Sequence, residues 1–484
     1  MDLAKEALFF DAWTKAEDVA TKMLVYLNEL RLQRGVLIHV YGRSIAKVTS
    51  VDVIKVHRYA KLITGEDLTV EDTYPVLAAI ARLDLSPCRL DLGKLTFKYK
   101  RSGVTSVDDF LRSELDSVIT GSKLVLAKPQ DLVLYGFGRI GRLLARILID
   151  KVGKGDKIRP RAIVVRKSGK DDLEKRAALL RYDSIHGKFS GTIEIDEEEN
   201  AIIANGNMMR LIDSANPEDI DYTQFGISDA ILVDNTGKLS DRAGLSRHLS
   251  AKGIKKVILS APGKGDVPNI VYGINNNTID PNEGVLSAAS CTTNAIAPVL
   301  KVVHDKYGIV SGHIESVHSY TNDQNLIDNF HKKPRRGRAA ALNMVITSTG
   351  AAGAVSKVLP ELKGKMTGNA IRVPTPNVSL AILKLTLQNP TNKEEINEYF
   401  RGIALNSALQ NQIDFVNSRE IASSDIIGSR HAGVVDGDAT LVNEADPRNV
   451  VLYVWYDNEY GYTCQLMRVI QQMAGIDLPD LPVY

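Results

Sequence analysis

The chain has 484 residues, enough for two or three domains that each bury a hydrophobic core. Lys and Arg total 60 against 58 Asp and Glu, so the net charge is only +2. This excludes a large field of one sign that would attract nucleic acid or an anionic membrane, and we expect neither partner. Hydrophobic residues make up 44% and charged residues 24%, a composition typical of globular domains and not of disordered chains.

The three cysteines, Cys88, Cys291 and Cys464, are far apart and form no CxxC pair. This spacing predicts neither a disulfide framework nor a thiolate metal site. The first residues lack a basic stretch followed by an apolar core, and no eighteen apolar residues run together. We therefore expect a cytoplasmic protein without a metal ion.

Apolar residues recur at helical spacing from residue 3 to about 34. Further helical patterns cover residues 50–62, 69–83 and 107–120, and a break follows at Gly121-Ser122-Lys123. Residues 1–122 are therefore predicted to form a mainly helical N-terminal module. It contains no ligand spacing, phosphate loop or nucleophile setting, so a docking or oligomer-stabilising role is favoured over a regulatory one.

Beyond the break, short apolar strands alternate with helices, which predicts an α/β fold with a mostly parallel sheet. The strands are expected at 131–135, 161–165, 230–233, 256–260 and 270–272, and the helices at 142–151 and 241–252. After a helix at 295–307, longer strands at 309–319, 368–373, 379–387 and 449–456 predict a second, α+β sheet. The domains are placed at 130–290 (Rossmann type), 291–455 (α+β) and 456–484, a C-terminal helix returning to the Rossmann domain.

A GxGxxG motif follows the first predicted strand and opens a helix, in the order that a dinucleotide site requires. Gly136 permits the tight turn, Gly138 lets the backbone approach a pyrophosphate, and Gly141 allows close helix–strand packing. The N–H groups at the start of the helix can bind the anion. The sequence therefore predicts a Rossmann dinucleotide site.

The second strand of this domain ends at Arg166-Lys167, where an acidic residue would read the ribose of NAD. A guanidinium can bind phosphate oxygens as a fork, so Arg166 favours NADP. Two alternatives stay open. The pair can be a solvated basic strand end, and Asp171 or Asp172 can reach the ribose of NAD.

Cys291 stands between an apolar strand and a predicted helix, within Ser290-Cys291-Thr292-Thr293-Asn294. At the first turn of a helix, the dipole is expected to lower the pKa of the thiol, and free N–H groups can bind an oxyanion. Cys291 is therefore predicted to be a nucleophile. The alternative is a buried, inert cysteine.

The segment 290–294 resembles the active-site sequence of the phosphorylating glyceraldehyde-3-phosphate dehydrogenases. The resemblance covers about residues 130–477 and includes six more blocks in the expected order. They are the glycine motif at 136–142, Tyr182-Asp183-Ser184-Ile185-His186-Gly187-Lys188, Ser260-Ala261-Pro262, His318-Ser319-Tyr320-Thr321-Asn322-Asp323-Gln324, Ser348-Thr349-Gly350-Ala351-Ala352 and Trp455-Tyr456-Asp457-Asn458-Glu459-Tyr460-Gly461-Tyr462.

By this resemblance His318, 27 residues after Cys291, is the catalytic partner, which physically would act as a general base. The resemblance assigns the substrate phosphate to Thr321 and Arg372. It assigns the attacking inorganic phosphate to Ser290, Thr292, Thr349 and Gly350, with further charge from Arg338 and Arg336. The expected cofactor contacts are Asn458 and Tyr462 at the nicotinamide, Arg139 and Ile140 at the pyrophosphate, and Thr236 and Ser260 on the wall of the site.

The implied reaction is the reversible, phosphate-dependent oxidation of glyceraldehyde 3-phosphate through a cysteinyl thioester, in glycolysis or, with NADPH, in gluconeogenesis. The implied assembly is a homotetramer. Two alternatives remain: an erythrose-4-phosphate dehydrogenase, which releases the acyl group to water, and a scaffold or RNA-contacting protein.

The sequence departs from the family pattern at several positions. Tyr135 stands for the usual Asn, Arg166 for an Asp, Ala295 for a second Cys and Gly353 for a Lys. The N-terminal module is the largest departure, because the common short form starts close to the glycine-rich strand.

Overall fold

The computed structural model describes residues 3–119, 125–151, 157–167 and 169–483. The chain divides into two compact units: unit 1 comprises residues 1–129, 152–157 and 475–484, and unit 2 comprises residues 130–151 and 158–474. The predicted break at 121–123 lies outside the described residues. Unit 2 covers most of the chain in which the sequence predicts a Rossmann-type and an α+β domain, whereas residues 475–484 of the predicted C-terminal segment 456–484 belong to unit 1.

Unit 1 contains the predicted helices and one that sequence analysis missed, α4. Thr49 and Thr69 are the N-caps of α2 and α3 and form capping boxes with Asp52 and Asp72. In each box the Thr side chain accepts from the Asp N–H, and the Asp carboxylate accepts from the Thr N–H. The pattern at 107–120 is broken at Leu115, which leaves the helical region, so two short helices form instead of one. The helices are α1 (Leu3–Glu29, continued by a π-helical turn Leu30–Arg34), α2 (Ser50–Thr64), α3 (Val70–Arg82), α4 (Leu92–Ser102), α5 (Val107–Glu114) and α6 (Asp116–Ile119).

Unit 1 also has a small sheet, so the prediction of a mainly helical module was incomplete. Its strands are β1 (Leu37–Val40), β2 (Arg43–Ser44), β3 (Arg89–Asp91) and β20 (Asp480–Leu481), in the order β2-β1-β3-β20. Strands of two to four residues are too short to show a period of two, which explains why the sequence pattern missed them.

The last strand of this sheet comes from the C-terminus. β20 runs parallel to β3, with Leu481 opposite Leu90. The Arg89 N–H donates to the Pro479 carbonyl at 2.8 Å, and the Arg89 guanidinium lies 3.1 Å from the Asp480 carboxylate. The Leu481 side chain is 8% exposed and joins the unit 1 core. The residues after Ala474 therefore complete the sheet of the N-terminal unit.

The first sheet of unit 2 has the Rossmann arrangement. Its strands are β4 (Gln130–Tyr135), β5 (Ile158–Val165), β6 (Ile193–Asp196), β7 (Ala201–Ala204), β8 (Asn207–Asp213), β9 (Ala230–Asp234), β10 (Ile254–Leu259) and β11 (Val285–Ser287). The order is β11-β10-β9-β4-β5-β8-β7-β6, with parallel pairing from β11 to β8 and an antiparallel edge. Strand order reverses beside β4, whose neighbours are β5 and β9, so a ligand crevice is expected at the carboxyl ends of β4 and β9.

Two predictions in this domain were wrong in detail. The strand expected at 270–272 is absent, because the Ile270 N–H pairs with Ser287 and the chain then turns at Val271–Asn275. The helix expected at 241–252 is only α9 (Arg242–Ser246), followed by a 3-10 turn at Arg247–Ser250. The other helices here are α7 (Arg139–Lys151) and α8 (Asp172–Arg181).

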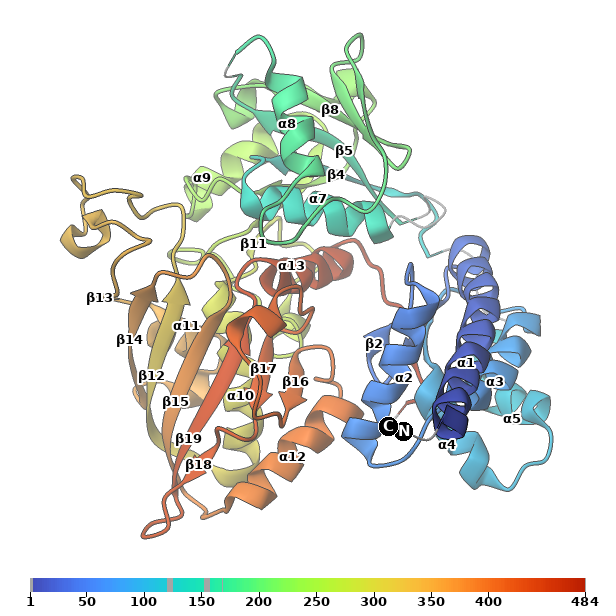
Figure 1. The fold of residues 1–484 in the computed structure, drawn as a ribbon. Helices are drawn as coiled ribbons and strands as arrows, with labels where there is room; N and C mark the ends of the chain where they lie inside the picture. The colour runs from blue at the N-terminus through green and yellow to red at the C-terminus, as the bar shows by residue number, and fades with distance from the viewer. Residues whose placement is uncertain (1–2, 120–124, 152–156, 168, 484) are drawn as a thin grey trace. The chain divides into compact units, whose positions relative to one another are not determined.

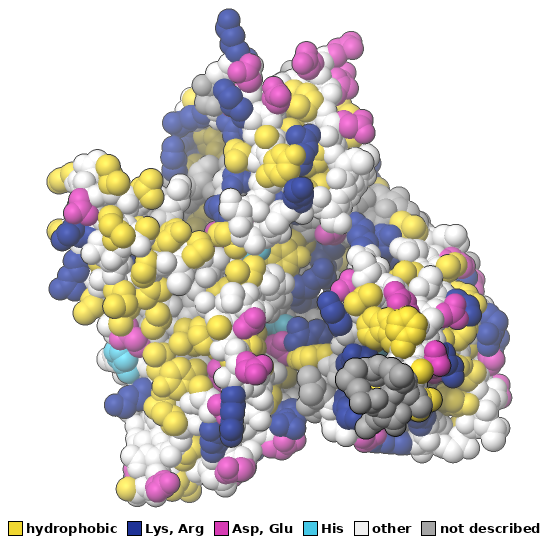
Figure 2. Space-filling model, in the orientation of Figure 1, with side chains coloured by type: hydrophobic (Ala, Val, Ile, Leu, Met, Phe, Trp, Pro, Cys, Tyr) yellow, Lys and Arg dark blue, Asp and Glu magenta, His cyan; other side chains and the backbone are white. Residues whose placement is uncertain are grey.

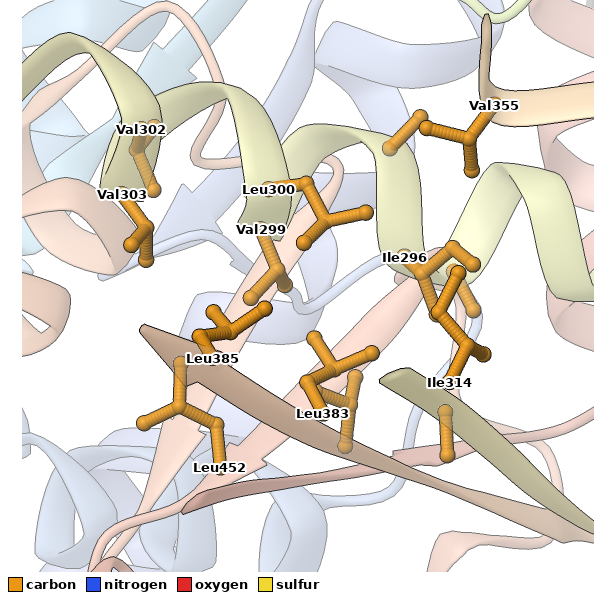
Figure 3. Packing of buried hydrophobic residues seen from close by; sticks show 14 of the residues in the cluster. Ile296, Val299, Leu300, Val302, Val303, Ile314, Val355, Leu383, Leu385 and Leu452 are labelled. Carbon is orange, nitrogen blue, oxygen red and sulfur yellow. The ribbon is translucent and has the colours of Figure 1, made fainter. Parts of the chain in front are cut away.

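The second sheet of unit 2 carries helix α10 (Cys291–Tyr307) against one face (Figure 1). Ile296, Val299 and Leu300 of α10 pack on the strand residues Leu383 and Leu452 (Figure 3). The strands are β12 (Ile309–Ser319), β13 (Val345–Thr347), β14 (Met366–Val373), β15 (Ser379–Leu387), β16 (Ile413–Val416), β17 (Gly433–Asp436), β18 (Leu441–Val442) and β19 (Asn449–Tyr456), in the order β13-β14-β12-β15-β19-β17-β16 with β18 beside β19. The remaining helices are α11 (Ala351–Val358), α12 (Lys393–Asn406) and α13 (Tyr460–Met473).

Replacing Leu481 by Ala is expected to lower the free energy of unfolding of unit 1 by about 2 kcal/mol, because a buried leucine is truncated at a sheet edge. The chain has two tryptophans, Trp13 in unit 1 and Trp455 in unit 2. In a Trp455→Phe background, the fluorescence of Trp13 during urea unfolding therefore reports unit 1. Val483→Ala is the matched control, because Val483 lies in the same tail but is 74% exposed. Equal losses in both variants would contradict a structural role for β20.

Candidate active site

Cys291 is the first residue of α10, where the helix N–H groups have no partners within the helix. Ser290 is the N-cap, and its Oγ accepts a hydrogen bond from the Thr293 N–H at 3.0 Å. Ala289 has a φ of 55°, a left-handed conformation that an L-residue adopts only when its surroundings enforce it. The thiol therefore sits on a strained turn that leads directly into a helix N-terminus.

Two side chains hold this turn in place. The buried Asn294 donates through Nδ2 to the carbonyls of Ala288 and Ser290 at 2.8 and 2.9 Å. The Tyr462 hydroxyl donates to the Ala289 carbonyl at 3.1 Å. Asn294 was not among the residues that the sequence identified as functional, although it belongs to the same short motif as Cys291.

His318 lies near the end of β12, with Nε2 at 3.5 Å from the Cys291 sulfur. Its Nδ1 lies 2.7 Å from the Ser319 carbonyl, to which it donates. Arg372 Nη1, which can only donate, also lies 3.1 Å from Nδ1, but the contact with the carbonyl, which can only accept, is the shorter one. The shorter contact favours the tautomer in which Nε2 accepts, so Nε2 can take a proton from a group at the sulfur. The structure brings together the two residues that the sequence paired only by resemblance.

Burial sets the charge of this pair in the protein without substrate. It raises the pKa of the Cys291 thiol, opposed by the positive charge of Arg372 and by hydrogen bonds at the helix start. Burial and the charge of Arg372 lower the pKa of His318 to about 4. The expectation that the helix start lowers the pKa of the Cys291 thiol was therefore wrong, because the effect of desolvation is larger. The resting pair is a thiol beside a neutral imidazole.

Arg372 forms the centre of an anion pocket next to His318. Its Nη1 donates to the Ser319 carbonyl at 2.9 Å and to Thr321 Oγ1 at 3.1 Å. Its Nε is buried and has no hydrogen-bond partner among the described residues. β14 places Arg372 directly opposite His318 in the parallel pair with β12. An unpartnered, buried guanidinium N–H is a donor prepared for an anion.

Of the two arginines expected to add charge, the structure brings Arg336 to this pocket. Arg336 is 12% exposed and pairs with Asp323, which also accepts from the Thr321 hydroxyl. Arg338 is 61% exposed and pairs with Asp328 instead. Thr349 and Gly350 precede α11, whose residue Ala352 packs with Cys291 against the same hydrophobic core.

Tyr456 is a site residue that sequence analysis did not single out. Its buried hydroxyl forms hydrogen bonds with Thr292 Oγ1 at 3.0 Å and Ser316 Oγ at 2.9 Å. Its ring meets the His318 ring edge-on, with centroids 6.0 Å apart. Tyr456 therefore positions both Thr292 and His318. The sequence feature that could have identified Tyr456 is its place in the block 455–462, which also contains Asn458 and Tyr462.

Asn458 follows β19 and is buried in a hydrogen-bond network. Its Oδ1 accepts from the hydroxyls of Ser319 and Ser379, both at 2.9 Å, which leaves Nδ2 as the donor for a ligand. The neighbouring Asp457 accepts from the N–H groups of Glu459 and Tyr460 and so fixes the start of α13. The amide is therefore held in a single orientation.

The glycine turn after β4 lines a cleft of about 490 Å³, within the roughly 300–1,000 Å³ typical of small-molecule sites. Gly136 has a φ of 92°, and a Cβ at Gly141 would lie 2.6 Å from the Gly136 carbonyl. A Cβ at Gly138 would meet no atom, so the backbone there faces open space. These features fit a dinucleotide, and Ile140 lies in the first turn of α7 beneath them.

The other predicted cofactor residues are engaged with the protein. The Arg139 guanidinium pairs with Asp183 and Glu459 and so connects α7 to the start of α13. Only the backbone of Arg139, at the start of α7, therefore remains for a ligand. Thr236 donates through its N–H and its hydroxyl to Asp234 Oδ1, both at 2.7 Å. The Ser260 hydroxyl donates to the Asp234 carbonyl at 3.1 Å. Both hydroxyls therefore stand at the ends of β9 and β10, and Thr236 lines the cleft.

Arg166 lines the same cleft at the end of β5 and is exposed. Asp172, one of the two acids that the sequence offers for the ribose of NAD, is buried in an ion pair with Arg176 at 2.7 Å. Asp171, the other, is 67% exposed and pairs with Lys175. Neither carboxylate lines the cleft.

Comparisons with known proteins agree with this geometry. The glyceraldehyde 3-phosphate dehydrogenase NAD binding domain matches residues 130–242, and the C-terminal domain of the same enzyme matches residues 290–458. A protein of Pseudomonas aeruginosa (strain UCBPP-PA14), named "Glyceraldehyde-3-phosphate dehydrogenase-like protein", is 56% identical over 463 residues, 95% of this chain and 100% of that protein. The chain belongs to the glyceraldehyde-3-phosphate dehydrogenase family.

Other members of the glyceraldehyde-3-phosphate dehydrogenase family match a smaller part of the chain. Glyceraldehyde-3-phosphate dehydrogenase 2 of Bacillus subtilis (strain 168) is 41% identical over 71% of this chain and 96% of its own length. The chloroplastic enzyme A of Zea mays is 41% identical over 69% of this chain and 79% of its own length. The Pseudomonas alignment is long enough to extend into unit 1, whereas these two leave more than a quarter of the chain unmatched.

Within the described residues, no group of three or more His, Cys, Asp or Glu side chains is arranged to hold a metal ion. No helix of the described part of the chain is long and apolar enough to cross a membrane.

Replacing Arg372 by Gln is expected to raise the pKa of both Cys291 and His318, because its positive charge stabilises the thiolate and disfavours the imidazolium. The pH profile of alkylation by iodoacetamide should therefore move to higher pH, with about a tenfold lower rate below the midpoint for each pKa unit. Mass spectrometry can follow Cys291 separately from Cys88 and Cys464, which are buried, have raised pKa values and serve as internal controls. A midpoint that moves to lower pH would contradict this assignment.

Replacing Tyr456 by Phe should lower the free energy of unfolding of unit 2 by about 1–2 kcal/mol, because two buried hydroxyls lose a partner. The matched control is Tyr399→Phe, whose half-buried hydroxyl donates only to the Val302 carbonyl at 3.3 Å. Urea unfolding followed by Trp455 fluorescence in a Trp13→Phe background measures both variants. Equal small losses would mean that Tyr456 does not anchor Thr292 and Ser316.

Proposed function

We propose that the chain is an NAD(P)-dependent phosphorylating aldehyde dehydrogenase. Its substrates would be D-glyceraldehyde 3-phosphate and inorganic phosphate, and its product 1,3-bisphosphoglycerate, in a reversible reaction. The observation that carries this proposal is the Cys291–His318 pair, with 3.5 Å between Sγ and Nε2, beside the unpartnered guanidinium N–H of Arg372.

In the oxidative half-reaction, the Cys291 sulfur bonds to the aldehyde carbon and forms a hemithioacetal, while its proton passes to the aldehyde oxygen. The N–H groups at the start of α10 stabilise the developing negative charge on that oxygen. The bound dinucleotide supplies the hydride acceptor. His318 Nε2, an acceptor with a low pKa, takes the hydroxyl proton as the carbon is oxidised to a thioester.

In the second half-reaction, an oxygen of inorganic phosphate attacks the thioester carbon, the C–S bond breaks, and the leaving Cys291 sulfur takes the proton that His318 holds, which restores the thiol and the neutral imidazole. Thr292, Thr349 and Gly350 are proposed to hold this phosphate, with Ser290 shaping the turn as the N-cap. Arg372 and Thr321 are proposed to bind the phosphate of the substrate, with Arg336 adding charge. Binding of a phosphate at Arg372 offsets its charge and so raises the pKa of His318 towards the range of an effective base.

We propose NADP as the preferred cofactor. The exposed Arg166 lines the cleft, while Asp172 is bound to Arg176 and Asp171 pairs with Lys175. An arginine at this position can donate to the oxygens of the 2'-phosphate of NADP. The ribose hydroxyls of NAD instead need a hydrogen-bond acceptor such as a carboxylate. Asn458, with its Oδ1 already occupied, is proposed to donate through Nδ2 to the nicotinamide carboxamide.

A homotetramer is the proposed assembly. Large apolar side chains of the segment between β12 and β13 are exposed, and hydrophobic side chains gather at the left edge of Figure 2. The exposed apolar residues of this segment are Leu326 (79% exposed), Ile327 (71%), Phe330 (92%), Leu342 (82%) and Met344 (74%). A second copy of the chain is the proposed partner for this segment.

The rate of NADP and NAD reduction with glyceraldehyde 3-phosphate should depend on inorganic phosphate and favour NADP. Cys291→Ser should abolish turnover, and His318→Asn should lower kcat by about 10²- to 10⁴-fold, because the general base is lost. Turnover of erythrose 4-phosphate without a phosphate requirement would support an erythrose-4-phosphate dehydrogenase instead. Full activity after deletion of residues 1–122, with an altered oligomer, would assign unit 1 to assembly or scaffolding.

A further inference from the structure

The cleft beside the glycine turn has a second arginine that the reaction does not use. Arg247 opens the 3-10 turn after α9 and lines the cleft together with Arg166 and Tyr135. Arg166 comes from the end of β5, so the two guanidinium groups reach the cleft from different elements. Arg176 also lines it, but its side chain is only 17% exposed, against 42% for Arg247, and donates to both Asp172 and the Arg166 carbonyl.

Glu218 holds Arg247 by one edge. Glu218 follows β8 in the 3-10 turn Pro217–Asp219, and its carboxylate accepts from Nε of Arg247 at 3.2 Å and from Nη2 at 2.9 Å. These bonds use the Nε–Nη2 edge of the fork and fix the plane of the guanidinium. Nη1 has no hydrogen-bond partner among the described residues and remains available to a ligand.

Tyr135 connects the two arginines. It is the last residue of β4, and its ring stands edge-on to His248 with centroids 4.6 Å apart, which fixes its position. The charges of both Arg166 and Arg247 act on its hydroxyl and lower its pKa, against the larger effect of burial, which raises it. Arg166, Arg247 and the protonated phenol of Tyr135 therefore all line the same cleft.

We propose that Arg166 and Arg247 form a two-arginine subsite for the 2'-phosphate of an adenine dinucleotide, with Arg247 as the second specificity-determining residue. This inference rests on the proposed function, because it assumes that the cleft holds the adenosine half of the cofactor. A phosphomonoester dianion has three oxygens and can accept from two guanidinium groups at once. The pyrophosphate has its own donors at Gly138 and the start of α7, so the two anions do not compete.

The test measures nucleotide binding to the full chain by calorimetry, without substrate. The probes are adenosine 2',5'-bisphosphate and adenosine 5'-monophosphate, which differ only in the 2'-phosphate. The variants are Arg166→Ala and Arg247→Ala. The matched control is Lys252→Ala, which removes a positive charge five residues further along the chain, from a side chain that pairs with Asp221 and does not line the cleft.

The unmodified chain should bind the bisphosphate at least about tenfold more tightly than the monophosphate, because charged hydrogen bonds contribute most of the difference. Arg247→Ala should weaken binding of the bisphosphate about tenfold and that of the monophosphate less than about twofold. Lys252→Ala should change neither by more than about twofold. Equal effects of Arg247→Ala on both probes, or none, would overturn the proposal.

This experiment separates the subsite from the proposed reaction. Selective binding of the bisphosphate that depends on Arg247, in a chain without phosphate-dependent turnover, would leave the subsite standing and overturn the proposed function. Phosphate-dependent turnover in a chain that binds both probes equally would overturn the subsite and leave the reaction standing.

Discussion

The active site depends on the turn that converts the end of the first sheet into α10. Ala289 adopts a left-handed conformation there, and the turn persists because Asn294 donates to the carbonyls of Ala288 and Ser290 and Tyr462 donates to that of Ala289. If this turn relaxed, Cys291 would move away from the helix start, and its sulfur would no longer lie 3.5 Å from His318 Nε2. α10 is anchored in turn by the apolar face that packs on the second sheet, so core packing holds the strained turn in place (Figure 3).

Desolvation and Arg372 together decide the protonation of the site. Burial disfavours the charged forms of both Cys291 and His318, whereas Arg372 favours the thiolate and disfavours the imidazolium. The same guanidinium stands ready for a phosphate. Any anion that offsets the charge of Arg372 would therefore also raise the basicity of the neighbouring imidazole.

The N-terminal unit is built from both ends of the chain. Its sheet takes its last strand from the C-terminus, directly after α13, whose first turns carry Tyr462. Arg139 and Glu459 tie the start of the same helix to the glycine-turn helix α7. The relative of Pseudomonas aeruginosa aligns over 95% of this chain, so it shares most of this unit as well.

The sequence by itself determined the local features: the glycine turn, the helix that follows Cys291, the alternation of strands and helices, and the family to which these motifs point. They could be predicted because period, turn residues and motif order are properties of neighbouring residues. Only the tertiary structure decided which distant side chains meet: Tyr456 on Thr292, Arg336 and not Arg338 at the anion pocket, and β20 beside β3. It also decided the charge of the Cys291–His318 pair, because desolvation depends on everything packed around a group and not on its neighbours in the chain.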